Sequence, residues 1–375
     1  MELEELLQNE VSEKRMLEEC VEEERERFVS LFFERGGEQH EEEEEINILR
    51  TRFEEMLQNA TKLQYMTRHT PEEFDSLFRE VAPAFSLLTN RGKARVRHWT
   101  VENVFPLKES LLLTLFWLAH YPTLSMIKIF FDIHERTVTK ILKKTIIRMA
   151  QILRNEIRWP TDEEFIQKKQ DFCFFQNIEF EHAVCVVDGT EIRIARPSKE
   201  PTQTRTWSGK KKQNSLNVMF ITYLNRVIIY FSAVRVGAHD QSHWNELHLR
   251  DRFIGKNFGI MGDGGFTFNR KADTVQIHGY KPIKSPKTPE EKLYNKKLSQ
   301  MRVVVENSIR RVKQWKVLQG VYRHWRDGKG QIPINDLLTV VVVLSNRKIL
   351  KCPPRQGDWV SPEWREIFES LNEDE

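Results

Sequence analysis

The spacing of apolar residues predicts that the first half of the chain is helical. Residues 107–120 form an apolar segment typical of a buried helix, and helical spacing continues through 123–131 and 135–144. A turn at Asp132-Ile133-His134 separates the last two segments. We therefore expect an all-helical region over about residues 70–155.

From about residue 180 the pattern changes to short β-branched and aromatic runs. Residues 183–187 and 258–261 predict strands that are closely followed by glycine residues. Residues 218–223 and 227–236 predict the two strands of a hairpin. Helices are expected from His239 through Leu247 and from Pro289 to Trp315, and residues 337–344 are expected to be a buried helix or strand. Strands mixed with helices in this order predict an α/β fold.

Three helix starts are marked by their capping residues. Thr70-Pro71-Glu72-Glu73 and Thr288-Pro289-Glu290-Glu291 each place a Thr at the N-cap, a Pro at the first helical position and a Glu three residues after the Thr. Thr161-Asp162-Glu163-Glu164 is a capping box without the Pro. At His239-Asp240 we interpret Asp240 as a further N-cap rather than a ligand.

The two helical segments around the turn at 132–134 have the layout of a helix-turn-helix. An ordinary helical pair with a basic, solvated face is the alternative, because helical hairpins are common. Residues expected to pack the two helices together are Ile127, Phe130, Ile133, Val138, Ile141 and Leu142. Residues expected to remain outside and contact DNA are Arg136, Thr137, Thr139, Lys140 and Lys143.

Charge is segregated along the chain, which changes the meaning of its net charge. The 375 residues carry 58 Lys and Arg against 55 Asp and Glu, a formal charge of +3. Residues 1–45 carry −13 and residues 361–375 carry −5, which leaves +21 on residues 46–360. A basic body between acidic ends predicts a polyanion partner such as nucleic acid.

Composition and short patterns exclude several classes of protein. The acidic start MELEELLQNE lacks the pattern of a signal peptide, and the apolar run at 111–119 is too short to span a bilayer, so no membrane association is expected. The four cysteines are scattered without CxxC spacing, which argues against a zinc site of that kind and against a disulfide framework. They are Cys20, Cys173, Cys185 and Cys352.

Two acids follow the predicted strands directly, and a third lies on the last long helix. Asp188 precedes Gly189, Asp263 lies within Gly262–Gly265, and Glu306 follows an apolar run. Ligands of open α/β sheets bind beyond the carboxyl ends of the strands. Three carboxylates there suit Mg²⁺, and two such ions about 3.5–4 Å apart catalyse phosphodiester displacement. The basic residues Arg302, Arg310, Arg311, Lys313 and Lys316 surround Glu306 and favour a phosphodiester substrate.

Each acid also has a simpler explanation. An Asp before a Gly is commonly a turn residue. Arg302, Glu306 and Arg310 are spaced i, i+4, so Glu306 could be part of a surface ion pair. The combination of all three acids in this order favours the catalytic interpretation.

Five stretches resemble the DDE-superfamily endonucleases related to PIF/Harbinger and IS5-type transposases. Together with the predicted helix-turn-helix at about 107–145, the resemblance covers roughly residues 70–345. The stretches are VVDGTEI (186–192), WSGKKKQNSLNVMFI (207–221), VGAHDQSHW (236–244), IMGDGGF (260–266) and LSQMRVVVENSIRRVKQWKVL (298–318).

The resemblance implies an RNase H-like catalytic domain, a mixed sheet flanked by helices, preceded by an all-α helix-turn-helix domain. It implies that Asp188, Asp263 and Glu306, separated by 75 and 43 residues, are the catalytic triad and bind Mg²⁺ or Mn²⁺, two ions per site. Phosphate contact is implied for Lys210, Lys211 and Lys212, with a solvated charge run or a nuclear-import signal as alternatives. From the basic helix face around Glu306, Arg302, Arg310 and Lys313 join the set of residues expected to bind DNA.

The function expected on this basis is that of a divalent-metal-dependent DNA endonuclease or transposase. A domesticated, non-catalytic DNA-binding or partner-recruiting nuclear protein is the alternative. The resemblance also implies a Myb/SANT-like partner protein and a nuclear location, with shuttling to the cytoplasm and a homodimer left open. The expected parts are an acidic, partly disordered tail at 1–62, a helical domain at 63–160, a nuclease domain at 161–350 and an acidic tail at 351–375.

Overall fold

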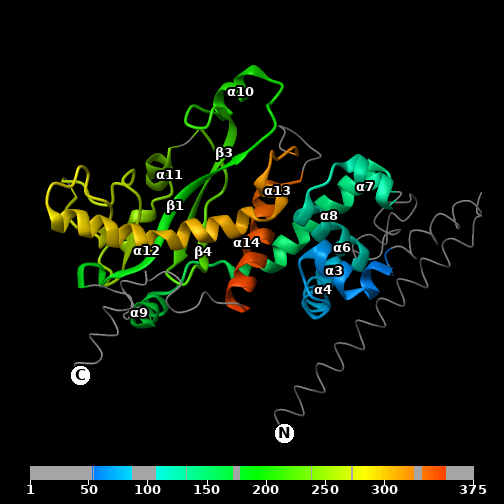
Figure 1. The fold of residues 1–375 in the computed structure, drawn as a ribbon, viewed down its shortest axis with the longest axis horizontal. Coiled ribbons are helices and arrows are strands. Elements are labelled where there is room, and N and C mark those ends of the chain that lie inside the picture. The colour runs from blue at the N-terminus through cyan, green and yellow to red at the C-terminus, as the bar shows by residue number, and fades with distance from the viewer. Residues whose placement is uncertain are drawn as a thin grey trace, which may run out of the picture. The chain divides into compact units, whose positions relative to one another are not determined.

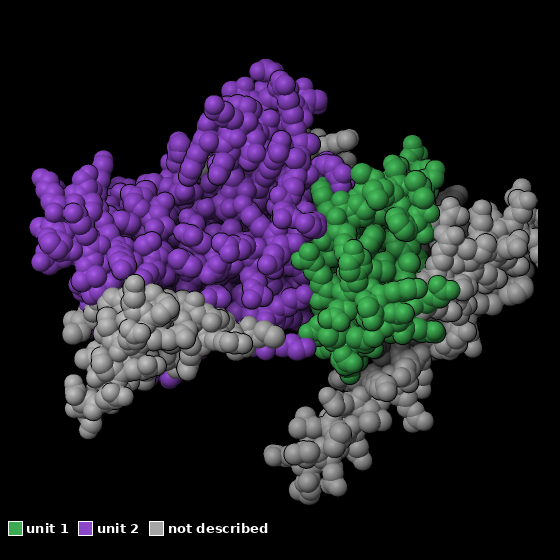
Figure 2. Space-filling view, viewed as in Figure 1, with its two compact units in different colours: residues 1–152 green, residues 153–375 purple. Residues whose placement is uncertain are grey.

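The chain divides into two compact units, residues 1–152 and residues 153–375 (Figure 2). The computed structural model describes residues 53, 55–86, 107–131, 133–171, 178–237, 239–271, 273–324 and 332–351. Both acidic ends, the turn residue Asp132 and three of the four cysteines lie outside these ranges. The fourth, Cys185, is buried as a free thiol.

The first unit is built from helices around a shared apolar core. Helices α3 (Ala60–Thr67), α4 (Pro71–Ser86) and α6 (Leu107–His120) contact one another, and α6 is buried along most of its length, as its sequence predicts. Helices α7 (Leu124–Phe131) and α8 (Glu135–Leu153) begin within one residue of the predicted starts, and α8 runs nine residues beyond the segment 135–144.

The prediction that Phe130 packs between α7 and α8 is wrong. The side chain of Phe130 is 57% exposed, whereas its neighbour Phe131 is buried and stacks on Phe53 with ring centroids 5.0 Å apart. Ile127 and Phe131 are spaced i, i+4, so they share one helix face, and Phe130 falls beside that face. The other five residues of the predicted set are buried.

The second unit is organised around a mixed sheet (Figure 1). Strand β1 (Ala183–Arg193) pairs antiparallel with β3 (Gln213–Tyr223) and parallel with β6 (Gly259–Met261), which in turn pairs parallel with β7 (Gly279–Tyr280). On its other side β3 pairs antiparallel with β4 (Ile228–Phe231), so the predicted hairpin is formed, although β3 begins five residues before 218 and the predicted strand 227–236 is divided. The two-residue strands β2 (Trp207–Ser208) and β5 (Arg235–Val236) also pair with β3.

Strand β1 is longer than predicted, and this moves Asp188 from the end of a strand to its middle. The sequence predicts a strand over 183–187, but pairing with β3 continues without interruption from Cys185 to Arg193. The β-branched residues Thr190 and Ile192 suit this extension. The first five residues of β1 are buried, whereas Asp188 to Glu191 are only half-buried.

Two helices cover opposite faces of the sheet at the centre of β1. The long helix α12 (Pro289–Lys313) crosses β1 (Figure 1) and contacts it through Lys313, which donates to the hydroxyl of Thr190. Helix α11 (Asp240–Glu246) places its first residue over Gly189. Because neighbouring residues of a strand point to opposite faces, α11 and α12 lie on different sides.

The three capping boxes are all formed, which confirms the predicted helix starts. Thr70, Thr161 and Thr288 each accept from the backbone N–H of the Glu three residues on, and that Glu accepts from the Thr N–H in return. They begin α4, α9 (Asp162–Asp171) and α12. The remaining elements are η2 (Arg154–Glu156), η4 (Ile178–Phe180), α10 (Glu200–Thr206), η5 (Leu249–Phe253), α13 (Lys316–Gln319) and α14 (Ile334–Lys351).

The second unit is therefore a mixed α/β fold in which a sheet is flanked by helices, as the sequence predicts. The apolar stretch at 337–344 proves to be the buried centre of helix α14. None of the described helices combines the length and apolarity that a membrane span would need.

Candidate active site

Asp188 is an acid held in a half-buried position on β1. Its carboxylate Oδ1 accepts a hydrogen bond of 2.9 Å from the backbone N–H of Gly189. Burial raises the pKa of Asp188 to about 6, and the charges of Asp263 and Asp240 act in the same direction. The guanidinium of Arg302 opposes them. Asp188 is thus not at an open sheet edge, as the sequence suggests, but in a partly dry site with other charged groups.

Asp263 is brought to Asp188 by close packing between two parallel strands. Val186 of β1 is paired with Met261 of β6, so Asp188, two residues further along β1, lies beside Asp263, which follows the end of β6. Gly262 has no room for a side chain, because an added Cβ would lie 2.7 Å from Phe268 and 3.2 Å from Val187. This glycine lets the Asp263 loop lie against Val187, the neighbour of Asp188 in sequence.

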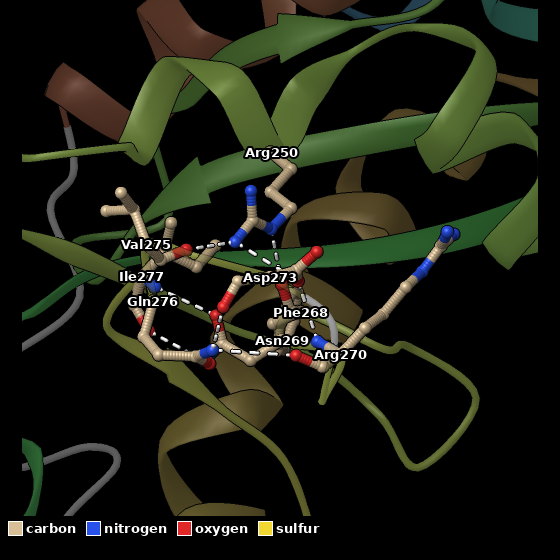
Figure 3. A network of polar contacts seen from close by, with 8 residues as sticks. All are labelled: Arg250, Phe268, Asn269, Arg270, Asp273, Val275, Gln276 and Ile277. Atoms are coloured by element: carbon tan, nitrogen blue, oxygen red, sulfur yellow. Dashed lines mark hydrogen bonds and ion pairs between the residues drawn. The ribbon is translucent and has the colours of Figure 1, made fainter.

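The loop that follows Asp263 is fixed by a polar network (Figure 3). The guanidinium of Arg250 donates to the carbonyl oxygen of Phe268 at 2.9 Å and forms an ion pair of 3.1 Å with Asp273. Asn269 bridges the same loop by exchanging two hydrogen bonds of 2.8 Å with the backbone of Ile277. Asp263 itself accepts from the N–H of Gly265 at 2.8 Å. These contacts therefore hold the loop that carries Asp263 in one conformation.

Glu306 is an exposed residue of α12, next to Val305 of the buried face of that helix. It is four residues after Arg302, which acts on the charge of Asp188, and seven before Lys313, which contacts Thr190. In a helix these spacings place the three side chains in one stripe. Glu306 is exposed, and it is not among the groups that shift the pKa of Asp188. Arg310, one turn further, is exposed.

The structure does not draw the three predicted acids into one tight cluster. Within the described ranges, no three His, Cys, Asp or Glu side chains lie close enough to hold a metal ion. The carboxylate oxygens of Asp188 and Asp263 are the donors that Mg²⁺ and Mn²⁺ prefer. The mutual repulsion that raises the pKa of Asp188 is the charge imbalance that a cation would relieve, so these two residues fit such an ion.

Asp240 is a charged neighbour of Asp188 that the sequence did not assign to the site. The prediction that it caps α11 is wrong: His239 is the N-cap residue, and Asp240 is the first residue of the helix. The Asp240 carboxylate accepts from the Asn217 amide at 3.2 Å and lies directly over Gly189, where a Cβ would come within 1.9 Å of its Oδ1. Gly189 is thus required by its neighbour rather than by a turn.

His243, one turn along α11, is completely buried behind this pair. Its Nδ1 lies 3.4 Å from the Asn217 side-chain oxygen, and its buried Nε2 has no hydrogen-bond partner. Burial and the nearby Arg235 lower the pKa of His243 to about 4, so the ring is neutral at physiological pH. Asn217 is therefore held between a neutral donor and the carboxylate of Asp240.

Lys313 and Glu191 connect the predicted basic segments to β1. Lys313 donates to the Thr190 hydroxyl at 2.6 Å and to the Glu191 carbonyl oxygen at 2.9 Å. Burial lowers the pKa of Lys313, and the nearby charge of Lys211 lowers it further. The Glu191 carboxylate accepts from Ser208 at 2.9 Å and from Ser215 at 2.8 Å. The turn of Lys210, Lys211 and Lys212 is thereby held near the end of α12.

The DNA-contact residues predicted on α8 lie on the outer side of that helix. Arg136 and Lys140 are exposed, and Thr137, Thr139 and Lys143 are half-buried. The Thr139 hydroxyl donates to the carbonyl oxygen of Glu135 at 2.9 Å, which leaves its methyl group as the outward feature. These positions agree with the predicted outward face, and DNA contact by them stays a prediction.

Comparison with known proteins points to one class. Residues 187–346 match the family model described as DDE superfamily endonuclease, a segment that includes all three predicted acids. A curated protein from Microchaete diplosiphon, a probable transposase for insertion sequence element IS702, is 29% identical over 144 residues. That alignment covers 37% of this chain and 49% of the relative, so the chain spans about half the length of the curated relative that it matches. No solved structure matches the chain.

The matched segment begins one residue before Asp188 and ends inside α14, so it covers most of the sheet unit. This part of the chain is similar to the DDE superfamily endonucleases. The family match does not extend to the helical unit, whose residues precede it.

Proposed function

We propose that the protein is a divalent-metal-dependent DNA endonuclease or transposase of the Harbinger type. One observation carries the proposal: Asp188, in the middle of β1, lies beside Asp263, which follows the parallel strand β6, in a segment that matches the DDE superfamily endonucleases. The strand order β4-β3-β1-β6-β7, with an antiparallel meander followed by two strands parallel to β1, supports an RNase H-like fold.

Asp188, Asp263 and Glu306 are the residues that we propose hold Mg²⁺ or Mn²⁺, two ions per site. Bound metal would supply Lewis acidity at the phosphodiester and activate the attacking water or 3′-hydroxyl. Glu306 is supported by its place in the same helical stripe as Arg302 and Lys313. Its exposed side chain is free to swing toward the two aspartates when cations bind.

The basic residues around the acids suit the charge of a DNA strand. Arg302 acts on Asp188 from α12, and its Nε is buried without a hydrogen-bond partner. A phosphate oxygen would satisfy that donor and pair with the charge. Lys313 is fixed on β1 by Thr190, so its ammonium is held in place before substrate binds. These groups position a phosphate, while the acids control proton and metal chemistry.

The helical unit and the cellular setting complete the proposal. We propose that α7 and α8 form the helix-turn-helix and that Arg136, Thr137, Thr139, Lys140 and Lys143 contact DNA. A Myb/SANT-like partner and a nuclear location are proposed with it. Both rest on the family resemblance of the sequence.

Cleavage of DNA by the purified full chain tests the function. Wild-type protein should nick or cut DNA in the presence of Mg²⁺ or Mn²⁺, and Asp188→Asn or Glu306→Gln should lower the rate more than about 100-fold, because each removes a proposed metal ligand. Glu163→Gln, which removes an exposed acid on α9, is the matched control and should cut normally. Equal rates for the wild type and both site variants would reject the proposal in favour of a non-catalytic DNA-binding role.

A further inference from the structure

Trp207 is an exposed tryptophan at one end of the sheet unit. Its side chain is 52% exposed, whereas Trp117, Trp244 and Trp315 are buried. Tryptophan carries a large apolar area and is highly buried on average, so leaving half of it in water forgoes stabilisation. Exposed aromatic faces of this kind occur where a flat ligand stacks.

The strand that carries Trp207 is anchored firmly. Trp207 pairs with Asn214, whose amide donates to Thr206 at 2.7 Å, and the Ser208 hydroxyl donates to Glu191 at 2.9 Å. The four-residue turn 209–212 then carries three exposed lysines and is closed by Lys212 in the left-handed region, with φ of 51°. The indole of Trp207 is therefore exposed on an anchored strand, next to a turn that carries three lysines.

Trp207 points to the same side of the sheet as Asp188. Ser208 contacts Glu191 on the face that α11 covers, so Trp207, its neighbour on the strand, points to the other face. That face carries Asp188 and Thr190 and is the one to which α12 brings Lys313. The lysine turn directly follows the strand that carries Trp207, and the charge of Lys211 is close enough to Lys313 to lower its pKa.

The geometry defines a path from the acids to the indole. The backbone N–H of Ile194 donates to the carbonyl oxygen of Asn214, the partner of Trp207, and Ile194 lies six residues beyond Asp188, one residue past the end of β1. At about 3.3 Å per strand residue this is roughly 20 Å, or about six nucleotides of stacked DNA. Lys313, which donates to Thr190 and to the Glu191 carbonyl oxygen, lies along that path, where backbone phosphates would pass.

We propose that Trp207 is a stacking site for an unpaired base of the DNA strand that is cut at Asp188. The proposal rests on the proposed nuclease function and specifies its substrate: DNA that is single-stranded about six nucleotides from the scissile phosphate. A base within a duplex keeps both faces covered by its neighbours, whereas an unpaired base exposes a face to the indole. The flanking phosphates are held by Lys210 and Lys211.

Binding of tailed duplexes in EDTA tests the proposal without requiring cleavage. The full chain is titrated into a labelled duplex with an oligothymidine tail and into the same duplex with an abasic tail of equal charge. Wild type should bind the thymidine tail on the order of 10-fold more tightly. Trp207→Ala should lose that preference and bind both substrates like the abasic one. Trp207→Phe should retain most of it, because a π-face remains.

Two further variants separate stacking from charge and from folding. Lys211→Gln should weaken both substrates equally and flatten the salt dependence, because it removes a phosphate contact. Ile166→Ala, which trims an exposed apolar side chain on α9, is the matched control and should bind as wild type does. Trp207→Leu keeps an apolar side chain and should bind like Trp207→Ala, with an unchanged Tm.

The proposal is overturned if wild type binds the two tails equally, or if Trp207→Ala weakens both to the same extent. Loss of metal-dependent cleavage in all proteins would count against the nuclease function alone, since binding is measured without metal. A thymidine preference that depends on Trp207 would stand even then.

Discussion

The two regions to which we assign DNA contact differ in how their charges are held. On α8, Arg136 and Lys140 stand exposed on a helix surface. At the centre of β1, Asp188 and Lys313 are half-buried, and burial moves the pKa of each toward its neutral form. The exposed charges of α8 have little effect on the free energy of folding. The half-buried charges at β1 destabilise the folded state.

Function is therefore expected to conflict with folding stability at β1 and not on α8. A solvated basic face can lose one charge with little effect on the fold. A half-buried acid beside two other acids is destabilising until a cation or a proton neutralises it. The predictions below use stability as well as DNA binding to test whether the two regions differ in this way.

The largest expected effect is stabilisation by Asp188→Asn. The folded-state pKa of about 6 lies above the unfolded value of 3.8, so ionisation of Asp188 destabilises the fold as pH rises from about 4 through 6. Removing the charge should add roughly 2–3 kcal/mol to the free energy of unfolding at pH 7 in EDTA. Chemical denaturation at pH 7 and pH 4 measures it.

The difference between Asp188→Asn and wild type should shrink to about 0.5 kcal/mol at pH 4 and disappear below about pH 3, where Asp188 is protonated in both states. A variant that is no more stable at pH 7 would place Asp188 in an ordinary solvated environment, like the residues of α8. The catalytic and stability effects of this one substitution then have opposite signs, which a generally damaging mutation does not produce.

Gly189→Ala is expected to have a smaller effect, and this effect is a loss of stability. The new methyl group would overlap the Asp240 carboxylate, which is held by Asn217, so the side chain or strand β1 must shift. We expect a cost of about 1–2 kcal/mol, or a fall in Tm of roughly 2–8 °C. Gly209→Ala is the matched control, since no atom lies within 4 Å of the added Cβ, and thermal denaturation of both should separate them.

The smallest effect is expected for Lys140→Gln on α8. The free energy of unfolding should change by less than about 0.5 kcal/mol, because the side chain is exposed. DNA affinity should fall a few-fold, and the slope of log K against log salt should decrease by about one. Fluorescence anisotropy at several salt concentrations measures both. An unchanged slope would mean that Lys140 does not contact DNA and that α7 and α8 are an ordinary helical pair with a solvated face.

Local signals in the sequence were enough for several elements. The three capping boxes are formed between residues three apart, so their helices could be placed without knowing the fold. Helix α6 was correct at both ends, because its long apolar run leaves no other structure that buries it. The hairpin of β3 and β4 followed from two apolar runs with a short turn between them.

Features that depend on distant partners could not be predicted in this way. The second half of β1 is a strand because β3 pairs with it, although Asp188-Gly189 has the composition of a turn. Asp240 and Glu191 have roles fixed by Gly189, Ser208 and Ser215, which lie 17 to 51 residues away in sequence. Phe130 and Phe131 are alike in chemistry, and helix geometry alone decides which is buried.

Strand β1 carries the core of the sheet in its first half and Asp188 in its second. Nothing in its pairing with β3 separates the two halves, since the register runs unbroken from Cys185 to Arg193. The amide protons around Asp188 should therefore exchange with solvent as slowly as those of the buried half, through opening of the whole sheet. The acid would then persist in its position for as long as the domain stays folded.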